Sequence, residues 1–162
     1  YKTGQSYEGS FVNEFYEGQG IYKWKDGDEY EGEWKNHKRD GWGIMKYANG
    51  DKLGCNWKGD SRHGKGKIVM SNGDVLEGKW VKDVLQTPVI ISYTNGDNYK
   101  GEINKKSFDR QGKGVLTSQN GDIYDGNWKK DKKHGEGVLN EKSGRKEKGI
   151  WKNDKEIGEK ES

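Results

Sequence analysis

The chain has few of the residues that build a conventional protein core. The apolar and aromatic residues (Ala, Val, Ile, Leu, Met, Phe, Trp, Tyr and Cys) make up 28% of its 162 residues, and there is one Pro. Cys55 is the single cysteine, which excludes an intrachain disulfide framework. No apolar run approaches the ~18 residues of a membrane-spanning helix, and no segment resembles a signal peptide. We therefore expect a cytoplasmic, reducing setting.

An excess of charge of one sign is also missing. The sequence has 30 Lys and Arg against 27 Asp and Glu, so its net charge is +3 with both signs interspersed. Aromatic residues interleaved with Lys are typical of stacking platforms for single-stranded nucleic acid. Here the acidic residues dilute the positive field that phosphate binding needs. We expect no nucleic-acid partner.

What the sequence does have is a repeat. The motif "YEGEW" (residues 30–34) recurs in related forms, and counting from its first residue gives a period of 23, extended once to 25. An array of such repeats buries apolar surface between neighbours and needs no central core. We predict one array over residues 1–158, with 1–6 as the tail of a preceding repeat and 159–162 as a tail. The chain then reads as a segment of a longer protein. The seven copies start at Tyr7, Tyr30, Leu53, Leu76, Tyr99, Tyr124 and Glu147.

Glycine decides the expected secondary structure of each copy. The chain contains 26 Gly, and each costs a helix about 1 kcal/mol. Asn-Gly-Asp, as at Asn49–Asp51, predicts a tight hairpin turn in which both turn residues have positive φ. The other joint, "NHKRDG" at residues 36–41, reads as a longer polar loop. Each repeat is therefore predicted to form one β-hairpin.

Alternation along the two strands predicts a glycine and aromatic face. Tyr30, Gly32 and Trp34 share one face, because side chains alternate along a strand. The opposite face is mostly charged. A ring from an adjacent strand can lie across a strand glycine, so we predict that the glycines are sockets for rings. The return strand adds Gly41, Gly43, Met45 and Tyr47 to the same face.

The pattern resembles a known repeat. Tyr-x-Gly-x-Trp, a basic polar joint, Gly-x-Gly, an aliphatic residue, an aromatic residue and Asn-Gly-Asp are similar to the MORN repeat (membrane occupation and recognition nexus), here in seven copies. The resemblance implies an all-β fold, an elongated single-layer antiparallel sheet of stacked β-hairpins with an aromatic groove along one side. It also implies an interaction scaffold in a cytoskeletal or ciliary (axonemal) assembly, sometimes with lipid binding.

Motifs for catalysis or metal binding are weak. Gly-x-Gly occurs without a following helix and without Gly-Lys-Ser/Thr, so it does not predict a phosphate loop. His37, His63 and His134 fall in the polar joint with no cluster of other ligands, and Cys55 has no local His partner. We predict that the chain is not an enzyme and needs no cofactor or metal.

The favoured function is protein binding. Trp and Tyr are typical of binding hot spots, and an aromatic groove suits a partner helix or an extended segment. End-to-end self-association is a second protein contact that an array allows. The predicted groove residues are Tyr30, Trp34, Tyr47, Trp57, Trp80, Tyr93, Tyr99, Tyr124 and Trp128.

Anionic membrane lipid is the alternative ligand. Each basic residue near such a surface contributes ~1 kcal/mol. Acidic residues interrupt the basic loops, so we expect any lipid binding to be weak and lost in salt. The basic loop residues are Lys35, Lys38, Arg39, Lys58, Arg62, Lys129, Lys130, Lys132 and Lys133.

The middle copies diverge from the pattern. Leu53 and Cys55 replace Tyr and Gly in the third copy, and the fourth copy has Thr87 and Val89 in place of Gly-x-Gly. Two interpretations stay open: neutral drift, or a changed groove that sets partner specificity. Where sockets are missing, we expect neighbouring rings to be less covered, namely Trp57, Tyr93 and Tyr99.

Overall fold

The computed structural model describes residues 4–159, which divide into two compact units, residues 4–86 and 87–159. These residues form strands and turns, and no helix among them is long and apolar enough to cross a membrane. The predicted N-terminal and C-terminal tails extend into residues 1–3 and 160–162, which lie outside the described residues.

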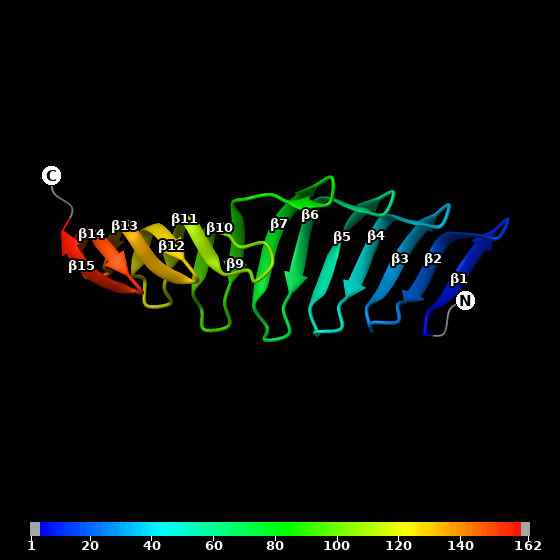
Figure 1. The fold of residues 1–162 in the computed structure, drawn as a ribbon, viewed down its shortest axis with the longest axis horizontal. Coiled ribbons are helices and arrows are strands. Elements are labelled where there is room, and N and C mark those ends of the chain that lie inside the picture. Colours follow the sequence, from blue (N-terminus) through cyan, green and yellow to red (C-terminus); the bar gives the residue numbers. More distant parts are fainter. Residues whose placement is uncertain (1–3, 160–162) are drawn as a thin grey trace. The chain divides into compact units, whose positions relative to one another are not determined.

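The first unit is an antiparallel sheet in which β1 to β7 follow one another in sequence order, with β8 paired to β7 (Figure 1). Each strand is joined to the next by a tight turn, so the unit is a row of hairpins. The strands are β1 (Ser6–Val12), β2 (Phe15–Lys23), β3 (Glu29–Lys35), β4 (Lys38–Lys46), β5 (Lys52–Lys58), β6 (Ser61–Val69), β7 (Val75–Val81) and β8 (Val84–Leu85).

The second unit has the same construction. Its strands also pair antiparallel in sequence order, from β9 to β15. The predicted all-β class and the predicted antiparallel hairpins are confirmed. The strands are β9 (Val89–Ser92), β10 (Asn98–Ile103), β11 (Arg110–Thr117), β12 (Ile123–Lys129), β13 (Lys132–Asn140), β14 (Lys146–Lys152) and β15 (Lys155–Glu159).

In every repeat but the fifth, the two joints are the reverse of what the sequence predicted; the fifth has a longer loop between Ile103 and Arg110. Asn36 and His37 form a two-residue turn with φ of 49° and 67°, and the residues that follow belong to β4. At the Asn-Gly-Asp joint only Gly50 has positive φ, at 97°, and its N–H donates to Tyr47 O at 2.9 Å. That geometry is a three-residue connection with a left-handed Gly at its end. The longer polar loop and the two positive φ values at Asn-Gly were therefore wrong predictions.

The Asp of the Asn-Gly-Asp motif links successive turns. Asp28 Oδ1 accepts the Ala48 N–H at 2.8 Å, and Asp51 Oδ1 accepts the Ser71 N–H at 2.9 Å. In the second unit Asp122 Oδ1 accepts the Lys142 N–H at 2.9 Å. Hydrogen bonds to a charged acceptor contribute about 1.5–3 kcal/mol when well formed, less where solvent reaches them. The motif therefore fastens each hairpin to the next one.

The glycines hold rings, as predicted. The Tyr30 ring lies over Gly43 in the paired strand, where an added Cβ would overlap it, and its hydroxyl donates to Glu33 O at 2.9 Å. Tyr99 lies over Gly114 in the same way. Each ring covers a glycine in the other strand of its own hairpin. For Tyr30, that hairpin is β3 paired with β4. The Tyr at the start of a repeat therefore requires the second Gly of Gly-x-Gly.

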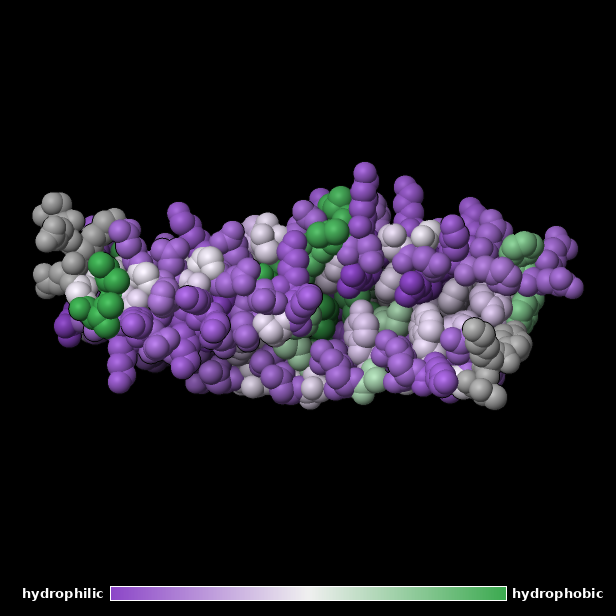
Figure 2. All heavy atoms as spheres, viewed as in Figure 1, coloured by the Kyte–Doolittle hydropathy of each residue, from purple (hydrophilic) through white to green (hydrophobic). Residues whose placement is uncertain are grey.

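The tryptophans join one hairpin to the preceding one. Trp34 Nε1 donates to Gly20 O at 3.0 Å, Trp57 Nε1 to Gly43 O at 3.4 Å, and Trp128 Nε1 to Gly114 O at 3.0 Å. Burying a large side chain contributes about 1.5–3 kcal/mol. The face seen in Figure 2 is mainly hydrophilic, and Trp34, Trp57 and Trp128 are buried.

Candidate functional site

Most of the predicted groove residues belong to the core. Seven of the nine are at most 5% exposed, which leaves a partner little of their surface. Only Tyr47 and Tyr93 are half-buried. The buried seven are Tyr30, Trp34, Trp57, Trp80, Tyr99, Tyr124 and Trp128.

The expectation that Trp57 and Tyr99 are less covered was wrong. The fully buried Leu53 and Cys55 fill the space of the missing Tyr and Gly, and the Arg39 guanidinium covers the Trp57 ring at 4.4 Å. Tyr99 lies over glycines of its own hairpin, so the substitutions in the fourth copy do not uncover it.

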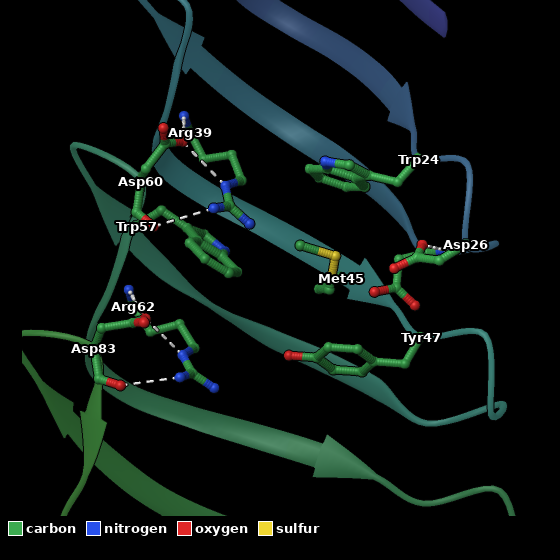
Figure 3. Close-up of a pocket in the computed structure, with 10 residues that line it drawn as sticks. Trp24, Asp26, Arg39, Met45, Tyr47, Trp57, Asp60, Arg62 and Asp83 are labelled. Carbon is green, nitrogen blue, oxygen red and sulfur yellow. Dashed lines mark hydrogen bonds and ion pairs between the residues drawn. The ribbon is translucent and has the colours of Figure 1, made fainter. Parts of the chain in front are cut away.

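Arg39, near the start of the return strand β4, contacts an Asp and two aromatic rings. Arg39 Nε donates to Asp60 Oδ1 at 3.1 Å and Nη2 donates to Asp60 O at 3.2 Å. Its guanidinium carbon lies 4.4 Å from the centre of the Trp57 ring and 5.6 Å from that of Trp24 (Figure 3). Cation–π contacts of this kind contribute about 0.5–2 kcal/mol. We call this arrangement, an Arg paired with an Asp and lying between two rings, an arginine rung.

The second unit contains the same rung. Arg110 Nε donates to Asp131 Oδ1 at 2.7 Å, and its guanidinium carbon lies 4.5 Å from the Trp128 ring centre and 5.4 Å from that of Tyr93. Each Arg and its Asp are 21 residues apart in sequence. The 21-residue spacing can be counted in the sequence, but it predicts an ion pair only when the contact between successive hairpins is known.

The rungs correct one assignment made from the sequence. Arg39 and Arg62 were placed in basic loops that face lipid, whereas they lie in β4 and β6 and form ion pairs with Asp60 and Asp83. Their charge is therefore largely compensated within the protein.

A pocket of about 430 Å³ lies between these groups in the first unit (Figure 3). Trp24 and Tyr47, which follow β2 and β4, point into it from one side, and the two Arg–Asp pairs stand opposite them. Sequence reasoning missed Trp24, which occupies the position of Tyr47 one repeat earlier. The pocket is lined by Trp24, Asp26, Asp28, Arg39, Met45, Tyr47, Trp57, Asp60, Arg62 and Asp83.

Burial and charge shift the pKa of two groups that line the pocket, Tyr47 and Asp83. Burial raises the pKa of Tyr47, so its hydroxyl stays protonated. Burial alone would raise the pKa of Asp83, but hydrogen bonds and the charge of Arg62 lower it. Burial raises the pKa of the Cys55 thiol to about 11. Tyr47 and Asp83 line the pocket and can contact a ligand, whereas Cys55 is buried outside it.

Metal binding has no support in residues 4–159, which contain no group of three or more His, Cys, Asp or Glu placed to hold an ion.

The family model of the MORN repeat matches residues 7–29, 30–52, 56–75, 109–123 and 124–140, more than half of the chain. No curated protein matches the sequence. Among solved structures, the TCP10 domain of Danio rerio CPAP, in complex with a STIL peptide, is 11% identical with a TM-score of 0.48. The alignment covers 82% of this chain and 64% of that one. The SAS-4 TCP domain of Drosophila melanogaster, in complex with a proline-rich motif of Ana2, is 14% identical with a TM-score of 0.38, covering 83% of this chain and 85% of that one. Similarity at this level gives no information on the partner of this chain.

Proposed function

This chain belongs to the MORN repeat family, and we propose that it is a non-catalytic protein-interaction scaffold that holds a partner segment against the first unit. The pocket between Trp24, Tyr47 and Arg62 carries the proposal. These three side chains come from successive hairpins, so one segment lying across the strands contacts all of them. Trp, Tyr and Arg are also the residue types most enriched at binding hot spots.

The pocket contains fewer of the predicted residues than the groove proposed from the sequence. Of the nine predicted residues, Tyr47 and Trp57 line the pocket, and Tyr93 is the half-buried residue of the second unit. The other predicted rings are buried, so they affect binding only by stabilising the fold. A partner helix and an extended segment both remain candidates for the ligand.

The wider setting follows from the resemblance and stays a proposal. We propose seven copies in a single array over residues 1–158, protein partners in a cytoskeletal or ciliary assembly, and self-association as a further contact. The hairpins that begin at Leu76 and Glu147, outside the matched segments, have strands at the predicted positions. Lipid binding ranks below protein binding, because Arg39 and Arg62 are already paired with Asp.

Selection from a random peptide display library tests the function. Peptides selected on the wild-type chain should bind the Tyr47→Ala variant at least tenfold more weakly, since truncating a hot-spot residue costs about 2 kcal/mol or more. Trp42→Ala is the matched control, because Trp42 is 51% exposed and lies outside the pocket. Melting curves of both variants identify any loss that is due to unfolding.

The proposal is wrong if selected peptides bind Tyr47→Ala as well as wild type while the Trp42→Ala variant loses them. It is also wrong if no enriched peptide depends on any residue that lines the pocket.

A further inference from the structure

The rung position at Arg62 has the Asp but lacks the rings of the other two. Arg62 makes the same Asp contacts, with Nε to Asp83 Oδ1 at 2.7 Å and Nη2 to Asp83 O at 2.9 Å. Among the described residues, however, no aromatic ring makes a cation–π contact with it. Its side chain is 29% exposed, against 19% for Arg39 and 16% for Arg110. The guanidinium is held in place while its flat faces lack rings.

The position of Trp80 explains the difference. Trp80 follows Arg62 by 18 residues, as Trp57 follows Arg39 and Trp128 follows Arg110. Trp57 and Trp128 each donate Nε1 to a glycine carbonyl of the preceding hairpin. In residues 4–159 Trp80 makes no such bond, and its Cζ3 lies 2.8 Å from where a Cβ on Gly66 would stand.

The divergence of the third copy causes this shift. In the hairpins that begin at Tyr7, Tyr30, Tyr99 and Tyr124, the Tyr covers the glycine equivalent to Gly66, but here that Tyr is Leu53. Leu is shorter than Tyr, and here Trp80 Cζ3 and Cys55 Cβ both lie 2.8 Å from where a Cβ on Gly66 would stand; Trp80 is 1% exposed. Trp80 does not line the pocket beside Arg62, whereas Tyr47 does.

We propose that the Arg62 rung binds an aromatic side chain of the partner segment, so that the ligand supplies the ring which the third repeat does not. The inference rests on the proposed function and deepens it. The molecule contains two examples of the completed arrangement, with one ring at 4.4–4.5 Å and a second at 5.4–5.6 Å from the guanidinium carbon. Tyr47 makes no cation–π contact with Arg62, but its hydroxyl end points toward Arg62 across the pocket (Figure 3).

The charges in the pocket favour a neutral aromatic guest. Four Asp and two Arg line it, so a carboxylate or phosphate meets net negative charge. A Lys or Arg guest is attracted by the Asp residues of the pocket but repelled by the Arg62 guanidinium, so it does not take the place of a ring on that guanidinium. An aliphatic side chain lacks the quadrupole that attracts a cation to a ring face. Phe, Tyr and Trp carry no charge at neutral pH and have a ring face that attracts a cation, so they fit beside Arg62.

Blocked tripeptides test the guest directly. Acetyl-Gly-Trp-Gly-amide is titrated into the chain, with the Leu and Glu analogues as matched controls, and the Nε–Hε resonances of Arg39, Arg62 and Arg110 are followed by NMR. The Trp peptide should shift Arg62 through its ring current and leave Arg39 and Arg110 unmoved. The Leu and Glu peptides should shift none of the three. Arg62→Gln, which removes the cation, should weaken Trp-peptide binding about 2- to 30-fold, the range of cation–π contacts.

A second variant fills the ring position beside Arg62 and leaves Arg62 itself unsubstituted. Leu53→Tyr with Cys55→Gly restores the pattern of the other repeats, so Tyr should cover Gly66 and return Trp80 to Arg62. The Arg62 resonance of this variant should resemble that of Arg39, and the Trp peptide should no longer bind. Unchanged Arg39 and Arg110 resonances report that the variant is folded.

The inference is overturned if the Trp peptide leaves Arg62 unmoved, if the Glu peptide shifts it as much, or if the double variant binds like wild type. If display-selected peptides still depend on Tyr47 in any of these cases, the proposed function stands and only the aromatic guest is wrong. If they do not, the proposed function falls with it.

Discussion

Replacing Gly43 with Ala tests how the repeat packs its tyrosines. The added methyl group would overlap the Tyr30 ring, which is fully buried and lies 5.1 Å from the Trp34 ring centre and 5.5 Å from that of Trp57. The ring has to leave its place, and its hydroxyl then loses the bond to Glu33 O.

The magnitude follows from these contacts. Overpacking costs about 1–3 kcal/mol and the hydrogen bond about 1 kcal/mol, while Ala gains about 0.5–1 kcal/mol over Gly in a strand. The free energy of unfolding should therefore fall by about 1–3 kcal/mol. Urea denaturation monitored by Trp fluorescence measures it, because Trp34 and Trp57 contact the displaced ring.

Two further variants make the result decisive. Gly54→Ala is the control, since its methyl would meet only the exposed Trp42 ring, at 3.1 Å, and it should leave stability unchanged or raise it by up to about 1 kcal/mol. Tyr30→Leu with Gly43→Ala should be less destabilised than the sum of its single variants, because the smaller side chain leaves room for the methyl. Equal stability of Gly43→Ala and Gly54→Ala, or strict additivity in the double variant, would refute the socket account.

Three other outcomes are expected. Because burial raises the pKa of Cys55 from 9.0 to about 11, its contribution to stability is complete below pH 9 and is lost as pH rises toward 11; native Cys55 should resist alkylation at pH 8 and react on unfolding. The pKa of Asp83 is lowered from 3.8, so its stabilisation is present above that pH and lost on acidification; the melting temperature of Asp83→Asn should accordingly change less than that of wild type below pH 4. Sedimentation with anionic liposomes should be weak and abolished by physiological salt; tight binding that is lost on changing Lys130, Lys132 and Lys133 to Glu would contradict this.

The hairpins and the Tyr–Gly pairing were predictable because both depend on local order in the sequence. Alternation puts Tyr30 and Gly32 on one face, and the period of the repeat identifies the matching glycine in the return strand. The turn at Asn36 and His37 was not predictable by the same means. It adopts two left-handed residues without glycine, which a rule based on Asn-Gly cannot recognise.

The site was harder to predict than the fold. A basic residue in a polar stretch is usually solvated, so Arg39 and Arg62 were assigned to loops. Each is held by an Asp 21 residues later, and Arg39 also contacts rings from two other hairpins. Likewise the exposure of Trp57 could not be read from a missing socket, because Arg39 covers the ring.

The repeat uses most of its binding groups internally, which determines where a partner can act. A Tyr hydroxyl bonds its own strand, a Trp indole bonds the preceding hairpin, and an Arg lies between two rings and an Asp. A repeat that satisfies all of these contacts offers a partner mainly charged surface. A substitution at one position, such as Leu53 for Tyr, releases a group several residues away, here Arg62, without exposing the substituted residue itself. Arg110 already has both rings, so its Nε–Hε resonance should not shift when aromatic peptides are added. In such arrays, the residues that determine partner specificity should lie one strand away from the residues that diverge.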